Sequence, residues 1–577
     1  MSRDRGLLTA CLFVVVAVLA APAAPAAQQF TVQNTVELLT ALNDAVDGDT
    51  VELLGGDYVL TDSLRPNTGV TLAGAGAGAT RLIYQGTGTN PDQRVIDLDQ
   101  RDRVTVTGLT VDGENRTAGG AAFGIYAAQG SGHVIDGVTV TQLAGDGFGP
   151  IGVYFNGGVD DAVVRNSTVT DIGVPVPASD GTPAYAGSTF GSGIRVFGDS
   201  DNVLIEHNTV DGTGRGGIFA RGRNDDDPVG PTLDGLVVRR NEVRNSALVV
   251  GTSGAADLGI ELQNDIIDAV VEYNKIDRRV SLDGVVGAAV RNNTVTQTIN
   301  NPNAPTPASF GLELVDSENV VFRGNTVDAT ADVDFGVSVS GNGDTRYAVF
   351  EQNTIDGADV FGAQIQGDDP GGDDGVVERV YFSRNLITDT TAGQMGTGDS
   401  IRLNEAFDDI TLDANQLGAR EGVDVFAANP PTGAEVTLSG NTRPPDDASL
   451  GALVTVPGGD PFVVADPLLL REVFIFAVGE AVSITFDQLD DLKQVLWDLG
   501  EGVPVVTTTG ALPGSASAGL TVGQELLAVG WSTTGEADSV LVRIVPEPSA
   551  ALALTAAAGL TLSRRSSRRS RPSPSSL

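Results

Sequence analysis

The sequence predicts an all-β protein whose short strands form a solenoid of stacked coils. The main observation is a phrase that recurs along the chain, for example VLIEHNTVDG at 203–212, AVVEYNKIDR at 269–278 and AVFEQNTIDG at 348–357. Internal repetition at such a period is typical of repeat architectures. The phrase keeps one asparagine in register at intervals of 19 to 33 residues, at Asn208, Asn241, Asn274, Asn293, Asn325, Asn353, Asn385, Asn415 and Asn441.

Each coil is predicted to contain two or three short strands. Around the asparagine, apolar residues such as Val203, Ile205 and Val210 alternate with polar ones, which is the period of a strand with one buried face. A second alternating segment precedes each phrase, as in GIELQND at 259–265 and GVSVSGN at 336–342. These segments open on a small residue, usually glycine, which we expect to turn the chain sharply. Strands of stacked coils pair in parallel with the coils above and below.

The recurring asparagine is predicted to have a structural role. A buried side-chain amide at a corner of the solenoid can donate to one neighbouring coil and accept from the other. A continuous ladder of such amides satisfies polar groups whose burial would otherwise be unfavourable. His207 lies directly before Asn208, so we expect it to be a corner residue as well.

These phrases and their spacing resemble the right-handed parallel β-helix proteins of the pectate-lyase-like superfamily, over about residues 30–445. The resemblance implies a right-handed parallel β-helix solenoid. TVELLTALNDAV at 35–46 has apolar residues at helical spacing, and DTVELLGGDYVL at 49–60 then begins the strands. A helix at this place would shield the open end of the solenoid from edge-to-edge pairing.

The chain divides into four predicted parts. Residues 1–27 combine two arginines, an apolar run and the small residues APAAPAA, which is the pattern of a secretory signal peptide. The solenoid with its N-terminal cap takes 28–445. Residues 446–544 are predicted to be a small β-rich domain or spacer that caps the C-terminal end of the solenoid or separates it from an anchor. Within it, DQLDDLKQVLWDLG at 487–500 has the pattern of a short helix.

The last part, 545–577, resembles the PEP-CTERM sorting signal of exopolysaccharide-producing Gram-negative bacteria. Pro546, Glu547 and Pro548 are followed by the apolar ALALTAAAGLTL and then by five arginines. The resemblance implies an exosortase-type processing enzyme, a transient membrane anchor at the C-terminus, and an exported protein at the cell surface, outer membrane or extracellular matrix. The apolar run is shorter than the ~20 residues of a full membrane span, and the arginines would stay on the cytoplasmic side.

The composition is that of an acidic protein, with 75 acidic and 35 basic residues among 577 and a formal net charge of −40. Such a surface repels nucleic acid, and it would need a basic patch or bridging cations to hold an anionic polysaccharide. Acidic glycine-rich loops at 224–228, 340–345 and 367–374 contain the oxygen ligands that Ca²⁺ prefers, or are solvated turns. The only cysteine, Cys11, lies in the leader, so the exported chain has no disulfide.

One column of residues is predicted to form a ligand site. The residue between the two apolar positions of each pre-asparagine strand should point outward, and stacking aligns these residues along the solenoid. The column contains Tyr126, Tyr154, Arg195, Phe219, Glu261, Ser281, Glu313, Ser338, Gln364, Arg402 and Asp424. Aromatic rings stack on sugar rings and arginine binds carboxylates or hydroxyls, so Tyr126, Tyr154, Phe219 and Arg402 are the candidate substrate-binding residues. A solvated strand face with scattered charge is the plainer interpretation.

Glu261, Glu313 and Arg195 are the candidate catalytic residues of this column. Adjacent coils lie about 4.8 Å apart, so two coils separate the carboxylates by about 9.6 Å, at the upper end of the ~6.5–9.5 Å used in inverting glycoside hydrolysis. That separation requires 279–285 to form a coil of its own. The long connection 173–191 would rise beside this face, because insertions in solenoids tend to line the functional side.

The catalytic motifs of polygalacturonases, mannuronan epimerases and pectate lyases are not found in the sequence. Lys275 follows a ladder asparagine and has no arginine partner that would make it the base of a lyase. The leading hypothesis is an exported surface or matrix protein that binds a polysaccharide, with its cleavage by a hydrolase or lyase reaction left open. The alternative is a non-catalytic structural or adhesive protein of the extracellular matrix.

Overall fold

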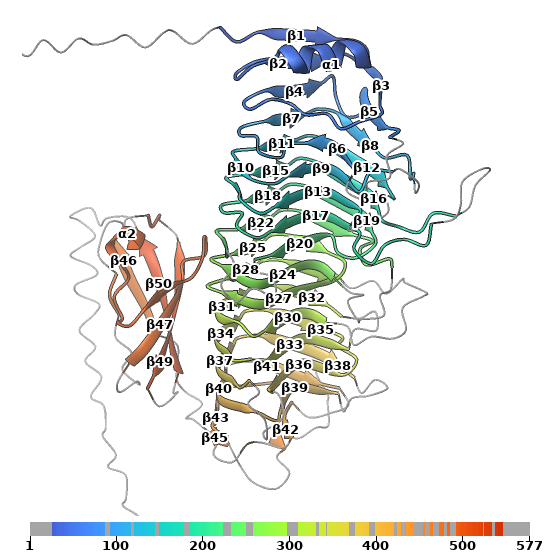
Figure 1. Ribbon diagram of the computed structural model, residues 1–577. Coiled ribbons are helices and arrows are strands. Elements are labelled where there is room, and N and C mark those ends of the chain that lie inside the picture. Colours follow the sequence, from blue (N-terminus) through green and yellow to red (C-terminus); the bar gives the residue numbers. More distant parts are fainter. Residues whose placement is uncertain are drawn as a thin grey trace, which may run out of the picture.

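The computed structural model is a three-sided parallel β-solenoid with a small β-sheet packed on its side (Figure 1). It describes residues 26–545 except for a set of segments, mostly short. These are 87–92, 117–119, 145–148, 178–184, 223–231, 250–257, 297–309, 330–333, 342, 368–374, 392–397, 421–423, 429–430, 432–433, 444–453, 456–461, 465–471, 478–481, 485–491, 518, 523 and 534–536.

Each coil passes through a front, a flank and a rear sheet, and strands of neighbouring coils pair in parallel. The front sheet contains β6 (Arg94–Asp97), β9 (Phe123–Ala127), β13 (Ile151–Asn156), β17 (Ser192–Phe197), β20 (Ile218–Arg221), β24 (Leu258–Ile267), β27 (Arg279–Val286), β30 (Phe310–Val315), β33 (Phe335–Gly341), β36 (Phe361–Gly367), β39 (Asp399–Asn404), β42 (Val425–Ala428) and β44 (Val454–Thr455). The flank sheet contains β1 (Gln29–Val32), β2 (Thr50–Leu53), β4 (Thr71–Gly74), β7 (Thr105–Thr107), β11 (Val134–Asp136), β15 (Val163–Arg165), β18 (Leu204–Glu206), β22 (Val237–Arg239), β25 (Val270–Glu272), β28 (Ala289–Arg291), β31 (Glu318–Arg323), β34 (Thr345–Glu351), β37 (Val377–Ser383), β40 (Phe407–Asp413), β43 (Val436–Ser439) and β45 (Phe462–Val464). The rear sheet contains β3 (Gly56–Leu60), β5 (Thr80–Tyr84), β8 (Thr110–Asp112), β12 (Thr139–Leu143), β16 (Thr168–Ile172), β19 (Thr209–Thr213), β23 (Glu242–Arg244), β26 (Lys275–Ile276), β29 (Thr294–Thr296), β32 (Thr326–Asp328), β35 (Thr354–Asp356), β38 (Leu386–Thr390) and β41 (Gln416–Ala419). The corner between front and flank holds the short strands β10 (Gly130–Ser131), β14 (Val159–Asp160) and β21 (Leu233–Asp234).

The first coil is covered by α1 (Thr35–Asp44), as predicted (Figure 1). The helix begins at Asn34, whose side chain accepts a hydrogen bond from the backbone N–H of Glu37 at 3.0 Å. The Glu37 carboxylate accepts in return from the backbone N–H of Gln33 at 3.0 Å, which completes a capping arrangement. Leu38 and Leu42 are buried beneath the helix, so its apolar face closes the end of the solenoid.

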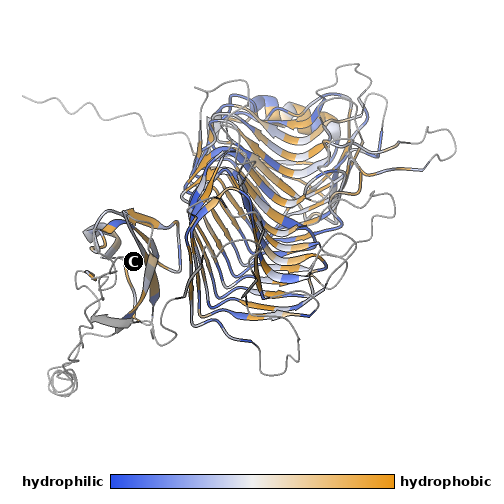
Figure 2. Cartoon of the chain, turned by 90° about the horizontal axis from the view of Figure 1, so that it is seen from below, coloured by the Kyte–Doolittle hydropathy of each residue, from blue (hydrophilic) through white to orange (hydrophobic). Residues whose placement is uncertain are grey.

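The core is a continuous stack of apolar side chains. Hydrophobic residues recur at matching places in successive coils (Figure 2). Phe322, Phe350 and Phe382 lie in three successive coils, with ring centroids 4.7 Å and 4.5 Å apart. This separation is close to the spacing of parallel strands, so each ring packs flat on the next. Repetition of one residue type therefore produces packing that a single coil could not have.

The asparagine ladder is confirmed. Asn353 donates from Nδ2 to Oδ1 of Asn385 and to the carbonyl oxygen of Phe322, both at 3.0 Å. Equivalent bonds link the ladder from Asn208 to Asn441. The residue before each ladder position has left-handed backbone geometry, as at His207 with φ of 54°. His207 is thus the corner residue that its position predicts.

The glycines that open the front strands do not turn the chain in the way we expected. At Gly336 and Gly362, φ lies outside the left-handed region. A Cβ atom on Gly336 would lie 2.1 Å from Cγ2 of Ile355 in the rear sheet and 2.6 Å from the carbonyl oxygen of Gly362. Glycine is needed there because a core side chain and the next coil both approach the backbone too closely for any side chain.

Residues 472–545 form a separate sheet that we call the C-terminal module. Its strand order is β46 (Glu472–Ala477), β50 (Ala537–Val545), β49 (Glu525–Ser532), β47 (Leu492–Asp498) and β48 (Val505–Thr507), with a one-turn α2 (Gly514–Ser517). The helix expected at 487–500 is wrong, because Leu492–Asp498 is a strand. Both faces of this strand are buried, with Trp497 in the module core and Leu496 against the solenoid. Its sequence therefore lacks the alternation of apolar and polar residues that marks a strand with one exposed face.

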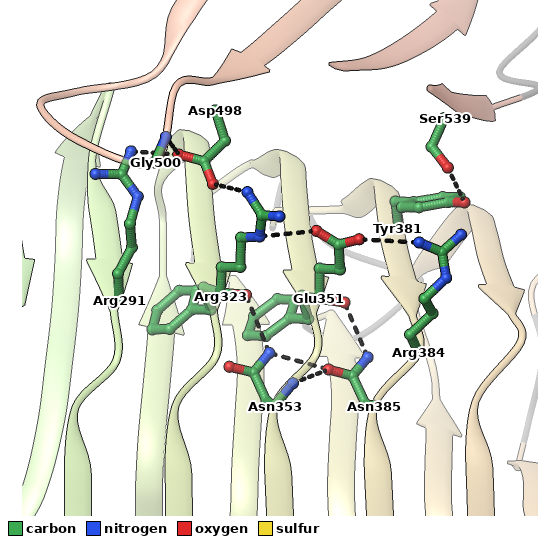
Figure 3. Close-up of polar contacts among 12 residues, drawn as sticks. Arg291, Arg323, Glu351, Asn353, Tyr381, Arg384, Asn385, Asp498, Gly500 and Ser539 are labelled. Atoms are coloured by element: carbon green, nitrogen blue, oxygen red, sulfur yellow. Dashed lines mark hydrogen bonds and ion pairs between the residues drawn. The ribbon is translucent and has the colours of Figure 1, made fainter. Parts of the chain in front are cut away.

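The C-terminal module packs on the flank sheet, so the expected cap at the end of the solenoid is also wrong (Figure 1). Tyr347 of the solenoid meets Trp531 of the module with ring centroids 5.5 Å apart. Charged side chains surround this apolar contact, and Asp498 pairs with both Arg291 and Arg323 (Figure 3). The solenoid itself continues past residue 445, because β44 and β45 pair with β42 and β43.

Candidate functional site

Strand pairing confirms the predicted column on the outer side of the front sheet, except at its last member. Asp424 is wrong, since Arg402 pairs with Phe426. The apolar alternation in this coil fits two registers that differ by two residues, so it could not distinguish them. The aligned residues are Tyr126, Tyr154, Arg195, Phe219, Glu261, Ser281, Glu313, Ser338, Gln364 and Arg402.

The column is far less exposed than a solvated strand face. Arg195, Phe219 and Glu261 in its middle are only 1%, 2% and 3% exposed. Glu313 and Arg402 further along are half-buried. The outward-pointing column is therefore not solvent-exposed from Tyr126 to Ser281 or at Ser338, where each residue is at most 6% exposed, although these residues do lie outside the apolar core.

The first part of the column is an aromatic cluster. The rings of Tyr126 and Tyr154 lie edge to face with centroids 5.5 Å apart, and Phe123 lies 5.4 Å from each. Asn156 joins the two hydroxyls, because it accepts from Tyr154 at 2.9 Å and donates to Tyr126 at 3.0 Å. The guanidinium of Arg94 lies 3.5 Å from the centre of the Tyr126 ring. This part of the face is apolar, with its few polar groups already hydrogen-bonded.

Arg195 occupies the next position and has no carboxylate partner among the described residues. Its Nη2 donates to the carbonyl oxygen of Phe190 at 2.9 Å and to the hydroxyl of Ser192 at 2.8 Å. Phe190 belongs to the long connection 173–191, whose C-terminal end thus reaches this face, as predicted. Burial lowers the pKa of Arg195 to about 10, so the side chain stays protonated at neutral pH. Its Nε makes no hydrogen bond.

Each candidate carboxylate is held by an arginine of the same face. Glu261 pairs with Arg215 at 3.3 Å and accepts a hydrogen bond from Gln263 at 2.6 Å. Glu313 pairs with Arg279 at 3.1 Å. Burial raises the pKa of Glu261, and the arginines around it oppose that rise only in part. Glu261 therefore holds a proton more readily than an exposed glutamate.

The coil between the two carboxylates exists as the sequence predicts, since β27 (Arg279–Val286) separates them. Ser281 pairs with Glu261 on one side and with Glu313 on the other. The carboxylates are therefore two coils apart, about 9.6 Å for strands spaced about 4.8 Å apart. The Ser281 hydroxyl donates to Glu313 at 2.6 Å, so the serine of the intervening coil is bonded to one of the two carboxylates. Lys275 lies on the rear sheet, away from both.

A row of three phenylalanines beside the column was missed by the sequence reasoning. Phe310, Phe335 and Phe361 pair in register at the start of three successive front strands, and each is half-buried. Their ring centroids are 5.2 Å and 5.7 Å apart. Arg279 lies over Phe310 and Arg402 lies over Phe361, so the row borders the column at both ends. The repeated FG dipeptide is the signal that could have identified it.

The calcium prediction is only partly covered by the structure. Loops 224–228 and 368–374 lie outside the described residues. In the third loop, Asp344 pairs with Arg346 at 3.7 Å and accepts from the backbone N–H of Val376 at 3.3 Å. Within the part of the chain that the structure describes, no three His, Cys, Asp or Glu side chains gather in a way that could hold a metal ion. Calcium stays a prediction, which a fall of the melting temperature in EDTA would support.

The comparisons with known proteins concern the fold. The family described as a right-handed β-helix region matches residues 94–277, which agrees with the parallel solenoid. No curated protein matches the chain. The A-module of a mannuronan C-5 epimerase from Azotobacter vinelandii is 15% identical, with a TM-score of 0.35 over 75% of this chain and 95% of that one. The catalytic unit of an α-1,3-glucanase from Streptomyces thermodiastaticus is 14% identical, with a TM-score of 0.41 over 73% of this chain and 67% of that one. A surface protein and adhesin of Streptococcus pneumoniae is 12% identical, with a TM-score of 0.38 over 75% of this chain and 93% of that one.

The predicted leader and the predicted sorting signal fall almost entirely outside the described residues, which begin at residue 26 and end at residue 545. Pro546, Glu547 and Pro548 lie just beyond the last described strand, β50. None of the described helices is long and apolar enough to cross a membrane.

Proposed function

We propose that this protein is exported to the cell surface or extracellular matrix and binds a polysaccharide along the outer side of its front sheet. The observation that carries the proposal is the column itself, in which aromatic, arginine and carboxylate side chains follow one another in register over successive coils. A polymer needs such a repeated surface, because it presents similar groups at regular intervals. Aromatic rings can pack on the apolar face of a sugar ring, and neighbouring hydrogen-bonding groups can bind its hydroxyls.

Export and surface placement rest on the two ends of the sequence. The leader at 1–27 supports secretion, and the order of Pro546–Pro548, apolar run and arginines supports an exosortase-type processing enzyme with a transient membrane anchor. Mass spectrometry of the protein recovered from the cell surface tests both. We expect an N-terminus near residue 28 and a C-terminus near residue 547. Recovery of the intact chain from the cytoplasm would contradict the proposal.

Glycan binding is tested with the purified exported protein on an array of neutral and acidic polysaccharides. We expect retention on at least one class of glycan, and loss of that retention in Phe219→Ala, which removes a ring from the middle of the column. Tyr273→Ala is the control for loss of a ring elsewhere, because Tyr273 is 48% exposed at a corner far along the coil from the front sheet, and circular dichroism must show that Phe219→Ala, which alters a buried residue, is still folded. Failure to bind any glycan would contradict the proposal and favour the structural alternative.

Cleavage of the bound glycan is the second candidate function. The observation that favours it is the raised pKa of Glu261, which suits a general acid, together with Glu313 two coils away as a base. Because hydrolysis needs both the acid and the base, Glu313→Gln and Glu261→Gln should each abolish any reducing-end release. Products that absorb as unsaturated sugars would instead indicate a lyase and direct attention to Arg195. Binding without product supports an adhesive or matrix role.

A further inference from the structure

The phenylalanine row of Phe310, Phe335 and Phe361 carries an inference about which polysaccharide binds. The three rings occupy one register position in consecutive coils and are half-buried, so each keeps part of its surface open. Their centroids follow one another at 5.2 Å and 5.7 Å along the solenoid. Of the column residues next to them, Ser338 and Gln364 are uncharged, and the charge of Glu313 is balanced by Arg279. The row is therefore an apolar track with neutral hydrogen-bonding groups at its side.

The charges of the front face are arranged so that little positive charge remains for an anionic ligand. Arg94 pairs with Asp97 at 3.0 Å, and Arg402 pairs with Asp399 at 3.1 Å. The two arginines at the centre of the site pair with Glu261 and Glu313, as described above.

Two further arginines of the face are described: Arg195 is 1% exposed, and Arg221, at the end of β20, is half-buried and engaged in a contact of its own. Arg195 lies between aromatic rings, 5.2 Å from the centre of Phe197 and 5.1 Å from that of Phe219. Since the whole chain carries a formal charge of −40, a polyanion would meet a repulsive field and find few free cations on this face.

We propose that the ligand of the front face is a neutral polysaccharide, which lies along the solenoid axis with its sugar rings packed against the exposed parts of the phenylalanine row. This inference rests on the proposed function and specifies its substrate class. Apolar contact with the half-buried rings supplies the affinity. Gln364, which is half-buried beside the row, supplies hydrogen bonds to sugar hydroxyls, and no charge on the ligand is needed.

Affinity gel electrophoresis of the purified protein tests the inference. Gels contain galactomannan or hydroxyethylcellulose as neutral polymers, or alginate or polygalacturonate as anionic ones. We expect retardation by at least one neutral polymer that does not change with salt, because no ion pair forms. Phe335→Ala should weaken it about tenfold, as the loss of a central aromatic anchor does at interfaces. Phe335→Leu retains apolar packing and removes the ring face, so it separates binding from folding. Tyr273→Ala is the control.

Each outcome bears on a different statement. Neutral retardation that is lost in both Phe335 variants and kept in Tyr273→Ala supports the inference. Retardation by alginate or polygalacturonate alone overturns the neutral class and leaves polysaccharide binding standing. Neutral retardation that both Phe335 variants retain overturns the role of the row. No retardation by any polymer overturns the inference together with the proposed function.

Discussion

Replacement of Asp498 by asparagine should loosen the C-terminal module from the flank sheet. The Asp498 carboxylate pairs with Arg291, whose side chain is 1% exposed, and with Arg323 at 3.0 Å (Figure 3). Breaking a buried ion pair by removing one partner costs about 3–5 kcal/mol. Arg323 keeps Glu351 at 3.2 Å, whereas among the described residues Arg291 keeps only the carbonyl oxygen of Gly502, so we expect a loss near 3 kcal/mol.

The two tryptophans of the chain make this measurement specific. Trp497 lies in the core of the C-terminal module and Trp531 lies in its contact with the solenoid, and both are fully buried. Tryptophan fluorescence during urea unfolding therefore reports on the module while the solenoid is silent. Glu525→Gln is the control, because its pair with Arg543 is exposed at both ends and should contribute about 0–1 kcal/mol. A loss in Asp498→Asn no larger than in the control would refute the role of the buried pair.

Three further predictions concern the solenoid. Asn353→Ala leaves its ladder neighbours unpaired and should lower stability by about 1–3 kcal/mol per unsatisfied group, measured by circular dichroism; Gln352→Gly at the exposed neighbouring corner should have little effect. Burial raises the pKa of Glu261, so its contribution to stability is complete below about pH 4.5 and is lost as the pH rises through the folded pKa. The melting temperature of Glu261→Gln, relative to that of the unmodified protein, should therefore rise from pH 4 to pH 8, and an equal difference at both would contradict this. Burial lowers the pKa of His133, so its contribution is complete above about pH 6.5 and is lost on acidification. The melting temperature of His133→Leu, relative to that of the unmodified protein, should therefore rise from pH 7 to pH 5. The same relative melting temperature at both pH values would contradict this.

The features that repeat with the coil could be predicted from the sequence. The ladder from Asn208 to Asn441 and the column from Tyr126 to Arg402 both follow from one register, which many copies of the phrase define together. Where a coil has a second alternation two residues away, as at Asp424, one copy alone could not decide the pairing. The function of a position is not repeated from coil to coil, so comparing the copies of the phrase gives no support for a functional role.

The features that depend on contacts between distant segments could not be predicted. Glu261 and Arg195 are buried, and their contacts with Arg215 and Phe190 involve segments outside the alternating strands, about which alternation carries no information. Strand β47 was mistaken for a helix because it is covered on both faces, one of them by a flank sheet far away in sequence. Phe335 was missed because it stands next to the opening glycine, outside the alternating positions.

The side on which the C-terminal module docks bears on how an anchored protein would present its ligand face. The module covers the flank sheet around Tyr347 and Tyr381, whereas the proposed ligand site lies on the front sheet. Strand β50 belongs to the module and ends at Val545, and the proposed sorting site at Pro546–Pro548 follows it directly in sequence. An anchor attached there would begin at the module, which is docked on the flank sheet. The module then leaves the proposed polymer track on the front sheet uncovered, which is what a surface protein that holds an extended glycan would require.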